Sequence, residues 1–131
     1  MTFVHGRHTY ISVDGNDLSA FTDSSELGRG ADVHDVTTYG KDDHVYEGGL
    51  RDATFKMSGV YDNGTAGPKV LEDLVGLKVV LIRRKEGTGT GLPQETVDVV
   101  VKGYTETNPV ADMIKWSADL QCSDAIVKLT Q

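Results

Sequence analysis

The 131-residue chain has only one cysteine, Cys122. It cannot form an internal disulfide, so the fold does not depend on an oxidising compartment. A single thiol also excludes zinc sites built from the cysteines of one chain. Because Cys122 shares the apolar face of a predicted strand with Trp116 and Leu120, we expect a buried structural thiol and not a reactive one.

Long apolar runs and clustered positive charge are also missing. No stretch approaches the ~18 residues of a membrane helix, and the first ten residues, MTFVHGRHTY, lack a signal-peptide pattern, so we expect neither membrane insertion nor export. The net charge is −7, and RRK at 83–85 is the one cluster among thirteen Lys and Arg. This balance argues against a grip on nucleic-acid phosphates. It is compatible with a surface that nucleic acid passes without sticking.

What the sequence does have is β-strand patterning over a length that suits one domain, residues 1–131. Fifteen glycines and three prolines separate short apolar or alternating runs, which predicts an all-β, antiparallel β-sandwich. The predicted strands cover residues 8–14, 24–30, 33–38, 51–62, 77–85, 95–107, 112–122 and 125–130.

The alternation predicts which side chains face the core. Residues 79–82 are apolar on both faces, which predicts a central strand. In 51–62 and 112–122 one face is apolar and the other polar. The expected inward residues are Ala53, Phe55, Met57, Ile114, Trp116, Ala118, Leu120 and Cys122.

One segment breaks the strand period. GPKVLEDLVG, residues 67–76, places its apolar side chains at helical spacing. Pro68 suits a first helical turn and Gly76 suits a C-terminal cap. We expect one short amphipathic helix near 68–75 that flanks the sheets.

Possible chemistry gathers in ADVHDVTTYGKDDHVYEGG, residues 31–49. On a strand, Asp32 and His34 would share a face, while Asp35 would face away. A metal would need further ligands, and His5, His8 and His44 are not at a supporting spacing. The alternative is a polar strand that leads into a surface loop. We favour that alternative and expect no metal and no cofactor.

Other catalytic patterns are incomplete. The chain has no G-x-S-x-G nucleophile elbow. EGTGTGLP, residues 86–93, is glycine-rich but lacks the Lys-Ser/Thr ending and following helix of a phosphate-binding loop, so it predicts a flexible hairpin loop. We therefore expect no catalytic residues.

A long polar loop near 39–49 carries Tyr39 and Tyr46. Ordered loops of this length are often functional, and tyrosines are favoured at protein interfaces. A merely solvated loop is equally compatible with the sequence. Residue patterns alone thus support an acidic all-β domain and leave its role open.

Several segments, in order along nearly the whole chain, resemble the major tail tube proteins of long-tailed (siphovirus-type) bacteriophages, especially phages of actinobacteria. The resemblance lies in the set of segments and includes the unusual strings HDVTTYGK and TNPVAD. The segments are ISVDGNDLSAF (11–21), ADVHDVTTYGK (31–41), YEGGLRDATFKMSGVYD (46–62), LVGLKVVLIRRKEGTG (74–89) and ETNPVADMIKWSADLQ (106–121).

The resemblance implies a structural virion protein without enzymatic activity. Such subunits form a β-sandwich with one flanking helix and assemble into hexameric rings. The rings stack into a tube around a tape-measure protein, and phage DNA passes through without specific binding. Tail terminator and tail-tip proteins are further implied partners. The implied location is the virion tail, with assembly in the host cytoplasm.

The resemblance also gives the polar residues an expected role. The loop would contact the next subunit or ring, which makes its polar and aromatic residues assembly candidates: Tyr39, Lys41, Asp42, Asp43, His44 and Tyr46. Polar strand faces supply candidates for the lumen: Lys56, Asp98, Lys102, Lys115 and Asp119.

Three alternatives remain open at this point. A tail terminator or minor tube subunit would share the strand pattern. A small ligand-binding β-barrel would need an apolar cavity, which one Trp and three Phe could hardly line. A metal-dependent enzyme would use His34 and Asp32.

Overall fold

The computed structural model describes residues 2–64 and 67–131, and within them the chain is an antiparallel all-β protein with one short α-helix. This confirms the predicted fold class. The strands are β1 (Tyr10–Val13), β2 (Asn16–Asp17), β3 (Thr22–Asp35), β4 (Tyr46–Val60), β5 (Lys78–Arg84), β6 (Pro93–Thr107) and β7 (Lys115–Thr130). The helices are α1 (Val70–Asp73) and two 3₁₀ turns, Gly6–His8 and Ser19–Phe21.

Two strands are longer than the sequence predicts. The sequence predicts separate strands at 24–30 and 33–38, but β3 is one strand that ends at Asp35, with a register shift between Ala31 and Val33. Likewise a single strand, β7, begins at Lys115 and replaces the predicted strands 112–122 and 125–130. In both cases glycine or polar residues interrupt the alternation, while pairing to a neighbouring strand carries the ladder across the interruption.

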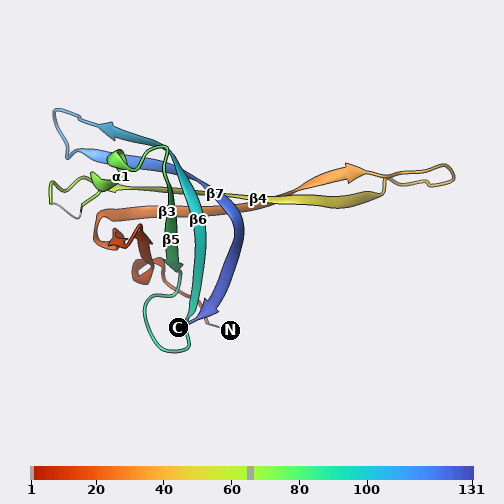
Figure 1. Ribbon diagram of the computed structural model, residues 1–131, viewed down its shortest axis with the longest axis horizontal. Helices are drawn as coiled ribbons and strands as arrows, with labels where there is room; N and C mark the ends of the chain where they lie inside the picture. Colours follow the sequence, from red (N-terminus) through yellow and green to blue (C-terminus); the bar gives the residue numbers. More distant parts are fainter. Residues whose placement is uncertain (1, 65–66) are drawn as a thin grey trace.

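The two layers of the sandwich belong to one hydrogen-bonded sheet. Its strand order is β2-β1-β5-β6-β7-β4-β3. The long strands β6 and β7 bend (Figure 1), so β5 pairs with one end of β6 and β4 pairs with the other end of β7. Register shifts in the β6–β7 ladder accompany the bend. The inner faces of both halves contribute to one core cluster.

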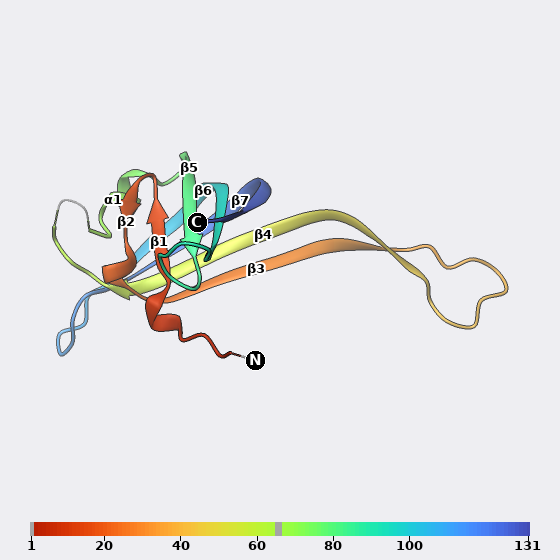
Figure 2. The same cartoon turned by 90° about the horizontal axis from the view of Figure 1, so that it is seen from below.

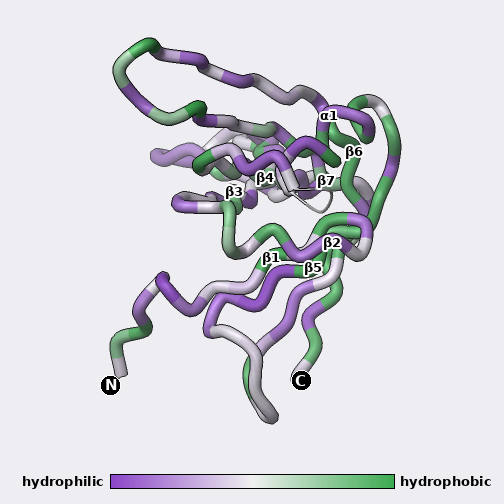
Figure 3. The backbone as a smooth tube through the Cα atoms, turned by 90° about the vertical axis from the view of Figure 1, so that its left-hand side faces the viewer, coloured by the Kyte–Doolittle hydropathy of each residue, from purple (hydrophilic) through white to green (hydrophobic). Residues whose placement is uncertain are grey.

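The core follows the predicted alternation, and hydrophobic and hydrophilic residues alternate along the strands in Figure 3. Phe55, Met57 and Trp116 are at most 2% exposed. The Trp116 indole Nε1 donates a hydrogen bond to the backbone oxygen of Phe21, at 3.2 Å. Burial raises the pKa of the Cys122 thiol, as expected for a structural cysteine.

One inward assignment was wrong, and the strand that is apolar on both faces is not buried on both. Ile114 is 38% exposed because it lies one residue before β7 begins and outside the packed part of the ladder. Val80 is 42% exposed, although β5 is central as predicted, between β1 and β6. The outer face of β5 has no covering layer within the described chain, so its apolar residues on that side meet solvent.

Helix α1 lies inside the predicted 68–75 segment and is only four residues long. Leu71 is fully buried in the core and anchors the helix. Gly76 has a φ of +85°, and its N–H donates to the backbone oxygen of Val101, at 2.8 Å. A left-handed backbone at this position favours glycine, which explains where the segment turns back toward the sheet. Within the described residues, no helix is both long and apolar enough for a membrane span.

The glycine-rich segment forms the predicted hairpin loop between β5 and β6. Gly87 and Gly91 both have positive φ. The side chain of Gln131 donates to the backbone oxygen of Gly87 and accepts from the N–H of Gly89, at 2.8 and 3.2 Å. The end of the described chain therefore fastens this loop.

Candidate assembly surfaces

The β3–β4 hairpin extends far beyond the body of the protein (Figures 1 and 2). β4 pairs with β7 only from Thr54 onward, so its first eight residues pair with β3 alone. Every residue from Gly28 to Asp52 is exposed. A two-stranded hairpin in water is marginally stable at best. Both faces of this hairpin are uncovered within the described chain, so it gains no support from packing against the body.

The loop at the hairpin tip covers residues 36–45 and not 39–49. The ladder continues to the pair Asp35–Tyr46, and the Val36 N–H donates to the backbone oxygen of Val45, at 2.9 Å. Residues 46–49 therefore belong to β4. The sequence could not predict where β4 begins, because its first residues are polar or glycine and show no alternation of apolar and polar side chains.

The predicted assembly residues all lie exposed at this tip. Tyr39 is fully exposed, and Tyr46, the first residue of β4, is 57% exposed. The His44 ring stacks on the Tyr46 ring with their centroids 6.0 Å apart. Lys41, Asp42 and Asp43 lie between these tyrosines along the chain.

Asp32 and His34 share a face, as predicted. Both side chains lie against Gly49, where an added Cβ would be 2.6 Å from His34 Nε2. His44 Nδ1 lies 3.4 Å from the Asp35 carboxylate. Among residues 2–64 and 67–131, no three His, Cys, Asp or Glu side chains are grouped so as to hold a metal ion.

Asp35 organises the loop instead. Its carboxylate accepts hydrogen bonds from the N–H and the hydroxyl of Thr37, at 2.9 and 2.6 Å. The Thr37 hydroxyl oxygen in turn accepts from the Val45 N–H, at 2.8 Å. A side chain that bonds its own backbone two residues on is a standard turn former. Asp35 and Thr37 therefore fix the conformation of the loop at the hairpin tip.

We expect this network to make the loop conformation depend on pH. The bonds from Thr37, its hydroxyl first, lower the pKa of Asp35 below the ordinary 3.8, with His44 adding less. Because the folded pKa is depressed, the ordered loop is favoured above pH 3.8 and is lost as the pH falls through the lower folded value. We expect the Thr37 and Val45 amide NMR signals to shift together with a midpoint below 3.8.

The variant Asp35→Ala provides the control for this titration. It removes the carboxylate, so the acid transition of both amides should disappear. A midpoint at or above 3.8 in the wild type would contradict the assigned network.

The outer face of β3, β4 and β7 is polar and of mixed charge. Lys56 pairs directly with Asp119 on one side and with Glu26 on the other. Lys115 lies on the same face, at the start of β7. Much of the remaining surface is small and polar, with Ser58 and Ser117 directly paired. Three of the five lumen candidates therefore share this one face.

The other two lumen candidates lie elsewhere, although both are exposed. Lys102 is the extra residue at the register shift between Val101 and Gly103. Asp98 pairs with Val80 on the other half of the sheet.

That other half also exposes an apolar patch. Val127 pairs with Thr96, which pairs with Ile82. Val127 and Leu129 are about half exposed, at 51% and 50%. Grouped exposed apolar side chains mark interaction surfaces. Val127 and Leu129 therefore form a second surface, apart from the hairpin, on which apolar side chains are exposed to solvent.

The RRK cluster does not form a basic patch. Arg83 makes an ion pair with the buried Glu95, with Nη1 and Oε1 2.8 Å apart. The Arg84 guanidinium lies over the Tyr10 ring, 4.6 Å from its centroid, and donates to Gln94. Two of the three cations are therefore held by neighbours and are not presented to a phosphate backbone.

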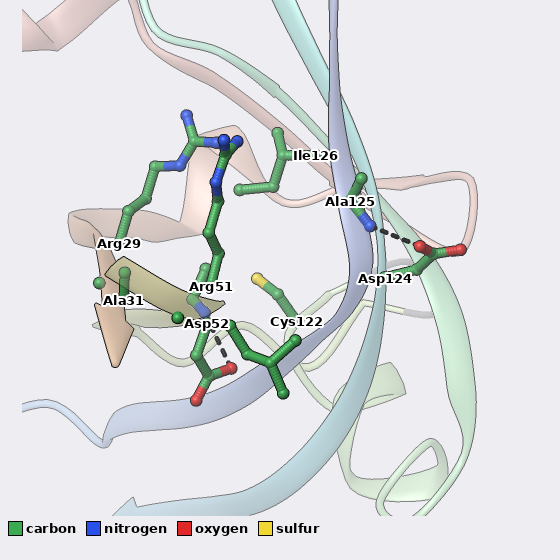
Figure 4. A pocket seen from close by; sticks show the side chains of 12 residues that line it. Arg29, Ala31, Arg51, Asp52, Cys122, Asp124, Ala125 and Ile126 are labelled. Atoms are coloured by element: carbon green, nitrogen blue, oxygen red, sulfur yellow. Dashed lines mark hydrogen bonds between the residues drawn. The ribbon is translucent and has the colours of Figure 1, made fainter. Parts of the chain in front are cut away.

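A cleft of about 960 Å³ opens where the hairpin leaves the body (Figure 4). One wall is the hairpin base, with Arg29 and Arg51, and the other is β7 near Cys122 and Ile126. It differs from the apolar cavity that a small ligand-binding barrel would need, because four charged side chains, Arg29, Arg51, Asp52 and Asp124, are part of its lining.

Comparison of the sequence with models of protein families and with curated proteins gives no match. Solved structures do match over nearly the whole chain. A chain of the virion of a native gene transfer agent (GTA) particle superposes with a TM-score of 0.81 at 12% identity, covering 98% of this chain and 100% of that one.

Two further matches are explicitly tails. A chain from the tail of an empty GTA particle, refined with C6 symmetry, gives a TM-score of 0.75 at 12% identity, over 95% of this chain and 98% of the other. The SPP1 tail tube gives 0.79 at 14% identity, over 98% and 80%. The protein therefore has the fold of the phage tail tube proteins, as the sequence resemblance predicted.

Proposed function

We propose that the chain is a major tail tube subunit that assembles into stacked hexameric rings forming a conduit for phage DNA. The observation that carries the proposal is the long β3–β4 hairpin. It projects from a body with the tail-tube fold and is exposed along its whole outer length. In this proposal the folded body forms the wall of the ring, and the exposed hairpin is the surface that contacts another subunit. The role is structural and involves no catalysis.

Unpaired sheet edges support ring formation. β3 is an end strand of the sheet, and β4 is its sole strand partner in the described chain. A 14-residue edge strand invites pairing with another chain. Packing subunits side by side in a ring would use such edges. The sixfold symmetry of the GTA tail supports six as the number of copies.

The polar face of β3, β4 and β7 suits a passage for DNA. Its charges alternate, as in the row Glu26–Lys56–Asp119, so it presents no basic stripe to phosphates. We propose that Lys56, Lys115 and Asp119 face the lumen. Asp98 and Lys102 are left out of this set, since neither lies on the face that carries the other three.

The role implies further partners. A tape-measure protein would occupy the lumen during assembly, and terminator and tail-tip proteins would close the two ends. The protein would then reside in the virion tail after assembly in the host cytoplasm.

Negative-stain electron microscopy of the purified protein, at low and high concentration, tests the proposal. We expect open-centred rings that stack into tubes as concentration rises. Single rings that never stack would instead indicate a terminator or a minor tube subunit. Compact monomers that bind a stoichiometric metal ion or a small apolar ligand would contradict the structural role.

Tyr46→Ala is expected to weaken ring stacking while leaving the fold intact. Tyr46 lies outside the core, and its exposed ring stacks on that of His44 at the hairpin tip. Tubes of Tyr46→Ala should be shorter than wild-type tubes at the same concentration, at an unchanged melting temperature. Tyr46→Phe keeps the ring and serves as the control. Full-length tubes of Tyr46→Ala would remove this residue from the interface.

A further inference from the structure

Two arginines, Arg29 and Arg51, are brought together at the hairpin base, in a cleft whose lining also includes Asp52 and Asp124. Arg29 pairs with Ala53, and Arg51 pairs with Ala31, so the arginines occupy diagonal positions on one face of adjacent strands. Their guanidinium groups lie beside each other near Ile126 (Figure 4). In the described part of the chain, neither has a carboxylate within ion-pair distance. Two like charges in this arrangement repel, and an anion between them would relieve the repulsion.

The cleft beneath these arginines has room for a segment of polypeptide. It lies between the hairpin base and the bend of β7, with a volume of about 960 Å³. The β4–β7 ladder ends at the pair Thr54–Gln121. Beyond it, the two strands separate and their facing edges have no strand partner among the described residues. The site therefore offers two guanidinium groups that make no ion pair among the described residues, an apolar floor around Ile126 and unpaired strand edges.

The hairpin tip of the same chain has the complementary charge. Residues 32–47 contain five carboxylates against one lysine, Lys41. The carboxylates are Asp32, Asp35, Asp42, Asp43 and Glu47. Residues 32–47, which are the 36–45 loop and the strand ends beside it, thus carry a formal −4 of the chain's −7, while the two arginines lie at the hairpin base.

The tip cannot reach its own cleft. Both strands run extended away from the body (Figures 1 and 2), so the tip lies at the opposite end of the hairpin from its base, where residues 29–31 and 49–53 line the cleft. A contact between them must therefore join two copies. Such a head-to-tail contact is heterologous, and repetition of it generates closed rings or open filaments.

We propose that the acidic tip of one chain docks in the Arg29–Arg51 cleft of a neighbouring copy. This deepens the proposed tube function, on which it rests, by assigning the acceptor surface for the hairpin. Carboxylates of the tip would accept charge-assisted hydrogen bonds from the two guanidinium groups, which have the planar geometry for bidentate pairing. The contact would order a hairpin that is otherwise marginal, and it would weaken with salt.

A charge-swap experiment tests the pairing. The cleft-reversed variant carries Arg29→Glu and Arg51→Glu, and the tip-reversed variant carries Asp42→Lys and Asp43→Lys. All four positions are exposed, so both variants should fold. Each variant alone has like charge on tip and cleft. A mixture restores opposite charge at every contact, because the two chains can alternate.

Association would be measured by sedimentation velocity and tube formation by electron microscopy, each in low salt and in 1 M salt. Each variant alone should associate at least about tenfold more weakly than wild type, since close interfacial charge pairs are strongly coupled. An equimolar mixture should recover assembly. The control variant, Arg7→Glu with Lys85→Glu, carries the same charge change away from the cleft and should assemble as wild type.

The outcomes separate the docking from the tube function. Normal tubes from either reversed variant would overturn the docking and leave the tube function standing. Failure of the mixture to recover association would also overturn the docking. Head-to-tail oligomers without open-centred rings, recovered in the mixture, would support the docking and contradict the tube. Normal assembly of the cleft-reversed variant with loss of bound inorganic phosphate would assign the arginines to an anion instead.

Discussion

A chain in which Asn-Gly replaces residues 32–50 is expected to fold like the wild type and to form no tubes. The replacement joins Ala31 to Arg51, which are already directly paired, through a two-residue turn that suits antiparallel strands. None of the removed residues contributes to the core cluster. The fold therefore keeps its packing, whereas the proposed assembly loses the whole projecting element.

The shortened chain also supplies an internal control. It keeps Arg29 and Arg51, so it should still accept the tip of a wild-type copy but offer no tip itself. Added to wild-type protein in small proportion, it should shorten the tubes, since each incorporated copy lacks a tip to extend the contact. Electron microscopy gives the tube lengths, and a thermal melt followed by circular dichroism checks the fold. Tubes of the shortened chain alone, equal in length to wild type, would contradict an essential role of the hairpin.

The second large effect is expected in the core, at Gly59. The variant Gly59→Ala should be destabilised by about 3 kcal/mol or more, at the upper end of the usual cost of overpacking. Gly59 is buried in β4, between Thr22 of β3 and Trp116 of β7. An added Cβ would overlap the backbone oxygen of Phe21 and lie 2.9 Å from the Thr22 Cα.

Backbone atoms cannot step aside as a side chain can. The Phe21 oxygen also accepts the Trp116 indole hydrogen bond, so a shift there would disturb the largest buried side chain. With a total stability of ordinary size, about 5–15 kcal/mol, such a loss removes a large share.

Urea unfolding of Gly59→Ala and of the matched variant Gly48→Ala measures this effect. Gly48 lies in the same strand, and an added Cβ there meets no atom within 4 Å. We expect Gly48→Ala to stay within about 0.5 kcal/mol of wild type. A similar stability for both variants would show that the backbone at Phe21, just before β3, can move aside, contrary to the packing described.

Strands with strict alternation were predictable, because burial on one face imposes a period of two. In β7 this period placed Trp116, Ala118, Leu120 and Cys122 in the core, and the structure confirms all four. The same rule failed at Ile114, where the strand had not yet begun. The rule also gives no prediction of the buried face in β3, because Leu27 is the one large apolar side chain from Asp23 to Arg29.

The candidate site was only half visible in the sequence. The tip residues could be picked out because two tyrosines and several carboxylates stand close together along the chain. Their acceptor could not, since Arg29 and Arg51 lie on different strands and meet only through the β3–β4 register. A shift of one residue would have placed the two side chains on opposite faces.

By itself, the sequence determined an antiparallel all-β fold, one short helix, the core of β7 and an acidic loop without a complete catalytic set. These features depend on local period and composition, which a linear chain displays directly. The tertiary structure decided that two layers come from one bent sheet, that the hairpin projects, and that a cleft with two arginines opens at its base. Each of these features depends on which strands pair, over how many residues they pair, and in what register. Such long-range pairing is set by packing between segments that are far apart in the chain.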